Sequence, residues 1–150
     1  INQIQSNSIS FFSFNEFYNN RDSFQNIKLQ LSKKLNQLSK PDIAILGLGE
    51  DGHTASIFPG TTNIDNKKNS LIVIKNNHET FSRVSLTFSY LMKARRLLFL
   101  ICGKSKAEAF SKCVYGNKIH EHFPSNYIFN NYKRRIDIYC DKAAASKLYK

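Results

Sequence analysis

The stretch IAILGLGEDGHTASIFPG, from Ile43 to Gly60, joins a short apolar run to a loop rich in glycine. The run Ile43–Leu46 is bounded by Pro41 and Gly47. Such a run is typical of a strand that is buried on both faces of a parallel sheet. The loop then lies at the carboxyl end of a strand, where open α/β sheets place their ligand-binding crevices. We therefore expect the functional site in this loop.

Helical and strand patterns alternate along the rest of the chain. Before the loop, apolar residues recur at steps of three and four from Phe24 to Leu38, which predicts an amphipathic helix. Residues 1–17 are expected to form a loop with one short strand at 9–12. Further strands are predicted at 71–74, 84–87, 97–101 and 136–139, and further helices at 90–94, 106–114 and 142–149. This alternation indicates an α/β fold with a mostly parallel sheet flanked by helices.

The 150 residues suit a single domain, residues 1–150, that is long enough to bury a core. Hydrophobic residues make up 41% and charged residues 22%, which is ordinary for a soluble globular protein. No uncharged apolar run approaches the roughly 18 residues that a membrane helix needs, and residues 1–10 lack the pattern of a secretory signal. Cys102, Cys113 and Cys140 are interpreted as buried free thiols in a reducing cytosol. We expect a cytoplasmic protein with no membrane partner.

The formal net charge of +11 has two explanations. One is an anionic partner, which would be a phosphorylated substrate, a nucleic acid or a membrane surface. The other is a coding bias, because Lys, Asn, Ile, Phe and Tyr are abundant and all are favoured by AT-rich codons. The lysines are scattered rather than gathered in one block, so we favour the coding bias and expect no nucleic-acid partner. A phosphate-binding pocket could still use a few of these charges.

The glycines of the loop, Gly47, Gly49 and Gly52, match the pattern G-x-G-x-x-G of dinucleotide-binding folds. Two carboxylates inside the loop would, however, meet a pyrophosphate of like charge. The Pro-Gly pair that ends the loop leaves little room for the long helix whose amino terminus should face the phosphates. The next strand is followed by asparagines rather than by an acidic residue that could bind a ribose. We therefore expect no nucleotide cofactor.

The loop also carries a candidate for acid–base chemistry. His53 can exchange a proton near neutral pH. Asp51 is two residues away, and a tight turn flanked by glycines could aim its carboxylate at the imidazole. Glycines permit unusual backbone angles and let N–H groups point into a pocket, where they could stabilise an oxyanion. His53 and Asp51 are the candidate catalytic residues.

The whole loop Gly47–Gly60 matches the signature Gly-x-Gly-x-Asp-Gly-His-Thr-Ala-Ser-x-Phe-Pro-Gly of 6-phosphogluconolactonases. The downstream order of the chain also resembles that family. The similar segments are Arg83–Thr87 (its Arg-x-x-Leu-Thr strand), Leu98–Ala109 (its strand, Gly-x-x-Lys turn and helix), Pro124–Ser125 and Asp141–Ala144 (its terminal Asp-x-Ala-Ala). The chain thus resembles the carboxyl-terminal part of a 6-phosphogluconolactonase.

This resemblance implies a Rossmann-like scaffold, shared with glucosamine-6-phosphate deaminases and ribose-5-phosphate isomerases. It implies hydrolysis of 6-phospho-D-glucono-1,5-lactone to 6-phosphogluconate in the oxidative pentose phosphate pathway, with no metal or organic cofactor. The deaminases are the nearest alternative, because they also carry an Asp-Gly-His loop. Their loop continues to Asn-Glu-Pro, whereas Ile57–Pro59 of this chain holds no carboxylate. The lactonase is therefore the favoured interpretation.

The resemblance also assigns residues to the substrate, which is a phosphorylated sugar lactone. Lys106 would bind the phosphate in the turn after Gly103, although a lysine that opens a helix is commonly solvated. Arg83 is either a substrate ligand or a partner in a structural ion pair. The segment His120-Glu121-His122 has too few spaced ligands for a metal site and is interpreted as a surface loop. The residues expected to bind substrate are Gly47, Gly49, Gly52, Thr54, Arg83 and Lys106, and no metal is expected.

The resemblance covers residues 24–149 well and residues 1–23 poorly. Members of the family carry a further amino-terminal part, with a Gly-Gly-Ser/Thr phosphate turn and an Asp-Glu-Arg motif, and neither appears in this sequence. Three explanations stay open: a fragment, a truncated gene product, or one half that needs another polypeptide. A non-catalytic remnant or partner subunit is the alternative function. Without the family's first strands, apolar surface would invite association. We therefore expect a missing amino-terminal half or a second copy as partner, and poor lactonase activity of the chain alone.

Overall fold

The computed structural model describes residues 24–62, 64–65, 71–74, 83–116 and 123–148. The expected strand at 9–12 and the segment His120–His122 lie outside the described residues. In chain order, the elements are α1 (Phe24–Gln37), β1 (Ile43–Gly47), β2 (Leu71–Ile74), β3 (Arg83–Leu86), α2 (Phe88–Leu91), β4 (Arg96–Ile101), the 3₁₀ helix η2 (Lys104–Lys106), α3 (Ala107–Tyr115), α4 (Pro124–Asn131), β5 (Ile136–Cys140) and the 3₁₀ helix η3 (Ala144–Lys147). Helix α4 is an element that the sequence pattern did not predict, and the expected last helix is reduced to η3.

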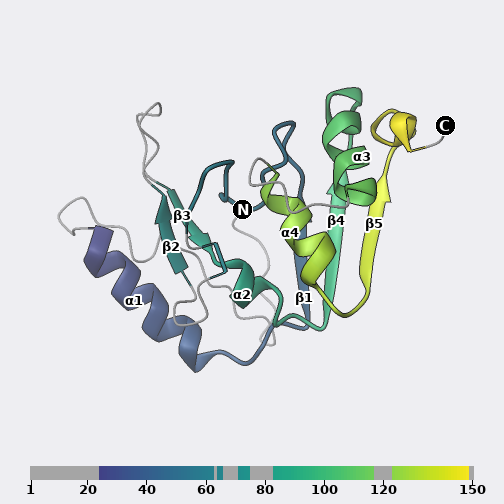
Figure 1. Ribbon diagram of the computed structural model, residues 1–150. Coiled ribbons are helices and arrows are strands. Elements are labelled where there is room, and N and C mark those ends of the chain that lie inside the picture. The colour runs from purple at the N-terminus through teal and green to yellow at the C-terminus, as the bar shows by residue number, and fades with distance from the viewer. Residues whose placement is uncertain (1–23, 63, 66–70, 75–82, 117–122, 149–150) are drawn as a thin grey trace, which may run out of the picture.

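Three parallel strands form the central sheet, in the order β1-β4-β5 (Figure 1). Gly47 of β1 is in register with Leu100 of β4, which is in turn in register with Tyr139 of β5. Parallel neighbours need a crossover connection between them, and α3 and α4 lie in the connection from β4 to β5. The predicted α/β fold, with a parallel sheet and flanking helices, is confirmed.

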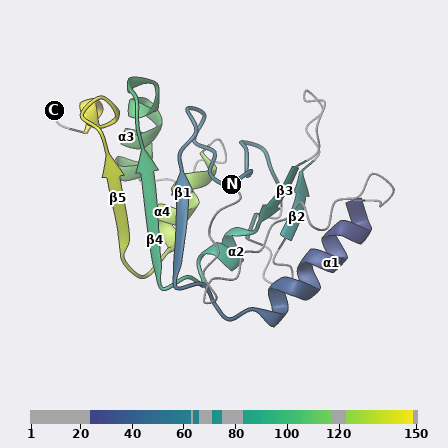
Figure 2. The same cartoon turned by 180° about the vertical axis from the view of Figure 1, so that it is seen from behind.

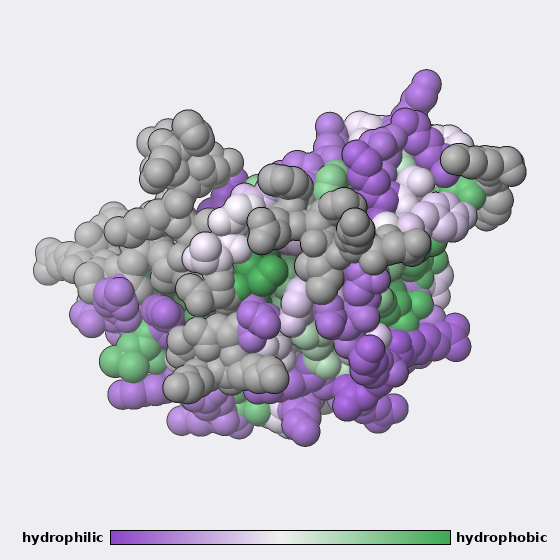
Figure 3. Space-filling model, viewed as in Figure 1, coloured by the Kyte–Doolittle hydropathy of each residue, from purple (hydrophilic) through white to green (hydrophobic). Residues whose placement is uncertain are grey.

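Helices α3 and α4 lie on the same face of the sheet, as the two opposite views show (Figures 1 and 2). Leu97, Phe99 and Ile101 alternate along β4 toward this face and are buried. The ring of Phe99 packs against Phe129 of α4, with the centroids 5.0 Å apart. Hydrophilic side chains predominate on the surface over α3, at the upper right of Figure 3. The main hydrophobic core therefore lies between the sheet and these helices.

The opposite face of the sheet is apolar and open to solvent. Ile45 of β1 is 65% exposed, Leu100 of β4 is 52% exposed and Tyr139 of β5 is 60% exposed. No helix among the described residues covers this face (Figure 2). The prediction that Ile43–Leu46 is buried on both faces is therefore wrong, because only Leu46 is buried and its neighbours Ile43 and Ile45 are exposed. Parallel sheets usually have both faces covered, so an open face of this composition is uncommon.

Strands β2 and β3 form a separate antiparallel pair. The sequence pattern predicted both strands but not their separation from the parallel sheet. The link between them, residues 75–82, is shorter than the dozen or more residues that a parallel crossover requires. Helix α1 packs against this pair through Ile27, Leu31 and Leu35, which form a second hydrophobic cluster with Leu71. This cluster is separate from the main core, to which Leu46, Leu48 and Ile57 beside the glycine loop belong.

The three cysteines are free thiols, and Cys113 is buried. Cys102 and Cys140 are exposed, so the expectation of burial was wrong for these two. Both lie at the carboxyl ends of strands, where the chain leaves the core. None of the described helices is long and apolar enough to cross a lipid bilayer.

Asp137 of β5 is a buried carboxylate between two arginines. Arg96 donates to its Oδ2 from Nη2 at 2.5 Å and from Nε at 3.0 Å, and Arg135 donates to its Oδ1. The hydrogen bonds from Arg96, and then those from Arg135, hold the pKa of Asp137 below its ordinary value of 3.8. These charge-assisted contacts fasten the amino ends of β4 and β5 together.

We predict that Asp137→Asn lowers the melting temperature at neutral pH by several degrees, because two arginines lose their ionised acceptor. Since the folded pKa lies below the unfolded one, this stabilisation is present above about pH 4 and is lost as the pH falls through the folded value. Thermal unfolding followed by circular dichroism should show the difference from wild type shrinking on acidification. Asp42→Asn is the matched control, because Asp42 is 81% exposed and pairs with Arg95 at 3.5 Å. Equal losses in both variants at neutral pH would contradict this role of Asp137.

Candidate functional site

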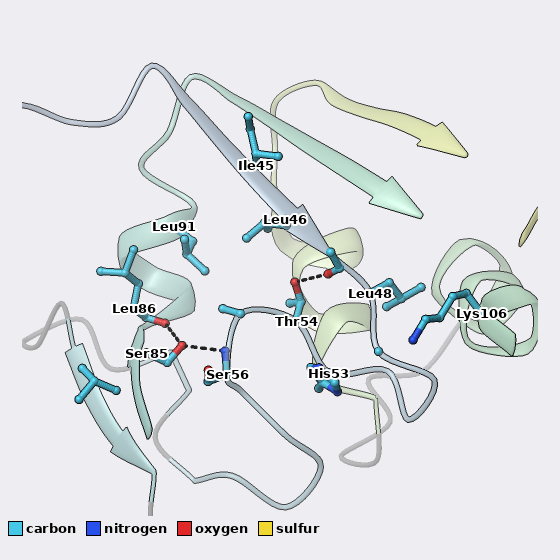
Figure 4. A pocket seen from close by; sticks show the side chains of 14 residues that line it. Ile45, Leu46, Leu48, His53, Thr54, Ser56, Ser85, Leu86, Leu91 and Lys106 are labelled. Carbon is cyan, nitrogen blue, oxygen red and sulfur yellow. Dashed lines mark hydrogen bonds between the residues drawn. The ribbon is translucent and has the colours of Figure 1, made fainter. Parts of the chain in front are cut away.

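A cavity of about 490 Å³ lies at the carboxyl end of β1 (Figure 4). The glycine loop forms one wall, β3 forms another, and the side chain of Lys106 reaches toward it from the end of η2. Of the residues predicted to form the site, Gly47, Gly49, His53, Thr54 and Lys106 line the cavity. The other predicted residues, Asp51, Gly52 and Arg83, lie outside the lining. Most of the residues predicted from the sequence to form the site therefore line one cavity.

Asp51 and His53 form a hydrogen-bonded pair beside this cavity. Oδ1 of Asp51 lies 2.6 Å from Nδ1 of His53 and accepts from the backbone N–H of His53 at 3.1 Å. Burial by itself raises the pKa of Asp51, but the hydrogen bonds from the backbone and the ring of His53 outweigh it, so the pKa lies below its ordinary value of 3.8. An ionised carboxylate only accepts hydrogen bonds. Nδ1 therefore carries the proton, and Nε2 is left to exchange protons with a ligand.

Close packing at two glycines makes this pair possible. A Cβ on Gly49 would overlap the ring of His53 and the carboxylate of Asp51. Gly52 has a φ of +81°, which favours glycine, and a Cβ there would overlap the ring of Phe123. At Gly47, by contrast, a Cβ would meet no atom within 4 Å. Space therefore dictates glycine at positions 49 and 52.

The backbone N–H groups of these two glycines hold the loop together. Gly49 donates to the carbonyl of His53 at 2.8 Å, and Gly52 donates to the carbonyl of Gly49 at 3.1 Å. From the sequence, glycine N–H groups are expected to point into the pocket, where they could stabilise an oxyanion. For Gly49 and Gly52 that expectation is wrong, because both donors are engaged inside the loop. These glycines shape the site by their lack of a side chain.

Residues 54–56 tie the loop to the strands on either side of the cavity (Figure 4). Thr54 is buried, and its hydroxyl donates to the carbonyl of Gly47 at 2.7 Å. The backbone N–H of Ser56 donates to the hydroxyl of Ser85 on β3 at 3.2 Å. Between them, Ala55 has a φ of 54°, a left-handed conformation that is uncommon outside glycine. The Thr54 hydroxyl is thus engaged in a structural bond, and Ser85 is a site residue that the sequence analysis missed.

The amino terminus of α4 supports the loop from outside the cavity. The backbone N–H of Ser125 donates to the carbonyl of Gly52 at 3.0 Å. The hydroxyl of Ser125 lies 2.9 Å from Sγ of the buried Cys113. The pair Pro124–Ser125 formed part of the family resemblance but carried no assigned role. Its place beside Gly52 shows that it fixes the turn from which His53 projects.

His53, Phe58 and Arg83 form a stack. The rings of His53 and Phe58 have centroids 4.5 Å apart and planes tilted by 37°. Cζ of Arg83 lies 5.4 Å from the centroid of Phe58, which is within the range of a cation–π contact. Two roles stood open for Arg83, substrate ligand or structural residue. Its position over Phe58, outside the cavity lining, favours the structural role.

Lys106 reaches the cavity from the turn that follows β4. At this turn Gly103 has a φ of +97°, and its N–H donates to Oδ2 of Asp141 at 3.0 Å. Asp141 also accepts from the N–H of Ala144 at 2.7 Å, so the segment after β5 fixes the turn after β4. Nζ of Lys106 lies 3.6 Å from Oε1 of Glu50 in the glycine loop. The structure thus places a cation against the loop that carries His53.

Within the parts of the chain that the structure describes, no group of three or more His, Cys, Asp or Glu side chains is arranged to hold a metal ion. The segment His120–His122, which the sequence indicates to be a surface loop, lies outside those parts.

The fold defines an α/β protein in which a histidine held by a carboxylate lies beside a cavity at the edge of a parallel sheet. The sequence model of the family of glucosamine-6-phosphate isomerases/6-phosphogluconolactonase matches residues 2–136. The chain belongs to this family, and the resemblance seen in the sequence is confirmed.

Particular relatives are similar to the chain along part of their length. The 6-phosphogluconolactonase of Aggregatibacter actinomycetemcomitans is 33% identical over 107 residues, which cover 71% of this chain and 45% of that protein. The structure of a 6-phosphogluconolactonase from Trypanosoma cruzi has a TM-score of 0.68 at 26% identity and covers 95% of this chain and 56% of its own. The structure of a monomeric glucosamine-6-phosphate deaminase has a TM-score of 0.71 at 28% identity, covering 85% of this chain and 56% of its own. The chain therefore spans about half the length of these relatives.

We predict that Gly49→Ala breaks the Asp51–His53 hydrogen bond, because the new Cβ needs the space that both side chains occupy. The measurement is the downfield proton resonance of the Nδ1–H group that donates to Asp51, followed by NMR. Gly47→Ala is the matched control, since its Cβ meets no atom within 4 Å. The resonance should vanish or move in Gly49→Ala and persist in Gly47→Ala. An unchanged resonance in Gly49→Ala would show that the loop can relax around the methyl group.

Proposed function

We propose that this protein hydrolyses 6-phospho-D-glucono-1,5-lactone to 6-phosphogluconate, in the oxidative pentose phosphate pathway. The observation that carries the proposal is the 2.6 Å contact between Asp51 and His53 beside a cavity that Lys106 also lines. A lactone is an activated ester with an internal leaving group. A base, a carboxylate that orients it and a cation that binds the phosphate therefore suffice for its hydrolysis. Membership of the family and the similarity to proteins named 6-phosphogluconolactonase support this choice of substrate.

In the proposed mechanism, Nε2 of His53 takes a proton from a water molecule as its oxygen attacks the lactone carbonyl. Asp51 stabilises the imidazolium that forms, as the carboxylate of a catalytic triad does. The ring C–O bond then breaks, and the imidazolium returns the proton to the departing ring oxygen. One water is consumed, and the product is the open-chain acid. Histidine and carboxylate both end the cycle in their starting protonation states.

Other residues would position the substrate and the base. Lys106 would bind the phosphate as a point charge. Phe58, with Arg83 behind it, would hold the plane of the imidazole, and the stack distances of 4.5 Å and 5.4 Å support that role. Gly47, Gly49 and Thr54 line the cavity and would shape the space for the substrate, whereas Gly52 would act indirectly, through the turn that it closes.

A cytoplasmic location and a partner complete the proposal. Three free cysteines fit a reducing compartment. The exposed apolar face around Ile45, Leu100 and Tyr139 fits a polypeptide partner. That partner would be either a part corresponding to the rest of the longer relatives or a second copy of the chain.

An amino-sugar-phosphate deaminase is not favoured as a second function. The loop after His53 presents Phe58 to the imidazole rather than a carboxylate. The remnant alternative, a scaffold without activity, makes a different prediction for the assay that follows.

We predict that His53→Ala lowers lactone turnover by at least about 10²-fold, which is typical for the loss of a general base. The assay follows lactone disappearance above spontaneous hydrolysis, in the longest polypeptide that contains residues 1–150. Thermal unfolding of the variant checks that the fold is kept. Near wild-type turnover in a folded His53→Ala protein would remove His53 from the mechanism. No turnover by the unaltered polypeptide would favour the non-catalytic scaffold.

We also predict that Lys106→Ala raises KM for the phosphorylated lactone more than it lowers kcat, because the lysine contacts a group remote from the reacting bond. The unphosphorylated lactone lacks that contact, so its kinetic constants should hardly change. Lys104→Ala is the matched control, since Lys104 lies on the same short helix but is exposed and does not line the cavity. Equal losses on both substrates would mean that Lys106 acts on the reacting centre or on the fold.

A further inference from the structure

The ion pair between Glu50 and Lys106 links the glycine loop to the turn that follows β4. Nζ of Lys106 lies 3.6 Å from Oε1 of Glu50, which immediately precedes the catalytic candidate Asp51. The lysine side chain is 27% exposed and lines the cavity, whereas the glutamate side chain is 62% exposed and does not line it. Lys106 therefore lines the cavity and at the same time contacts an exposed carboxylate that lies outside the cavity lining.

We propose that Glu50 is an internal anion that occupies Lys106 until the phosphate of the substrate replaces it. The proposal rests on the function proposed above, because it takes Lys106 as the phosphate-binding cation. It assigns Glu50 the role of a specificity-determining residue, and Glu50 itself contacts neither the lactone ring nor the reacting bond. Binding of the phosphate is then an exchange of one anion for another on the same ammonium.

The charges of the two anions decide the direction of this exchange. A carboxylate carries one negative charge, and an ion pair that is largely exposed is weak, so Glu50 is displaced easily. A phosphomonoester carries nearly two negative charges near pH 7 and presents three strong acceptor oxygens. The ammonium of Lys106 has three N–H donors, so it can donate hydrogen bonds to phosphate oxygens as well as to a carboxylate. A dianion therefore binds this ammonium more strongly than Glu50 does, whereas a ligand with a single carboxylate binds it about as strongly as Glu50.

The position of Glu50 also protects the neighbouring pair. Asp51 is the next residue in the loop, and its carboxylate accepts from both the ring and the backbone of His53. An ammonium drawn to Asp51 would compete with His53 for that carboxylate. Glu50 offers Lys106 a different carboxylate while the cavity lacks substrate.

The closing experiment uses inorganic phosphate as the probe, so that turnover is not the readout. Isothermal titration at constant ionic strength gives the phosphate dissociation constant for wild type, Glu50→Gln, Lys106→Gln and the double variant. Glu108→Gln is the matched control, because Glu108 pairs with Lys112 at 3.2 Å and with Lys147 at 2.5 Å, away from the cavity lining. It removes the same charge from the chain without touching the proposed exchange.

Glu50→Gln should bind phosphate about 1.5- to 5-fold more tightly than wild type, the range expected from removing one exposed ion pair. Glu108→Gln should change the affinity by less. Lys106→Gln should weaken binding, and in that background Glu50→Gln should bring no further tightening, because the shared ammonium is gone.

Three results would overturn the proposal. If Glu50→Gln tightens phosphate binding equally with and without Lys106, Glu50 merely repels the phosphate and does not compete with it for the lysine. Unchanged or weaker binding in Glu50→Gln would mean that the glutamate does not compete. Absence of saturable phosphate binding in every variant would remove the exchange altogether. If phosphate binds in the expected pattern but the lactone is not hydrolysed, only the function proposed above fails.

Discussion

The candidate site depends on a close approach between backbone and side chains at Gly49 and Gly52. The ring of His53 and the carboxylate of Asp51 occupy the space that a Cβ on Gly49 would need, and Phe123 occupies the corresponding space at Gly52. Hydrogen bonds inside the loop then close the turn. The absence of a side chain at Gly49 and the closed turn together allow Nδ1 of His53 to lie against Asp51. A glycine pattern that resembles a nucleotide-binding fingerprint serves here to build a carboxylate–imidazole pair.

The parallel register of the sheet brings the other half of the site to this loop. Gly47 at the end of β1 is in register with Leu100 near the end of β4, so the loop and the turn that precedes Lys106 leave the sheet at the same edge. Asp141, after β5, fixes that turn through Gly103. Open α/β sheets gather ligands at the carboxyl ends of their strands for this geometric reason. The 3.6 Å contact between Glu50 and Lys106 is one result of it.

Elements with strong periodicity could be predicted, and the way in which they meet could not. The spacing of Ile27, Leu31 and Leu35 alone predicts α1, and these residues are indeed its buried side. The pairing of β2 with β3 depends on the short link between them, a signal that was present in the sequence and not used. Helix α4 starts at Pro124, a residue that is favoured in the first turn of a helix, but its apolar pattern is short. The exposure of Ile45 depends on which elements cover the sheet, which is a property of the whole chain.

By itself, the sequence determined the α/β class, the position of the glycine loop after β1 and the two residues, Asp51 and His53, that meet in it. These follow from apolar spacing and from one contiguous motif, both of which are local. Only the tertiary structure decided that the N–H groups of Gly49 and Gly52 are engaged within the loop, that Arg83 lies over Phe58, and that Lys106 meets Glu50. Side-chain contacts such as the last two join residues far apart in the chain, and the direction of an N–H group depends on how the whole turn closes. Their geometry is set by the register of the strands and the packing of the helices between them, which no local pattern encodes.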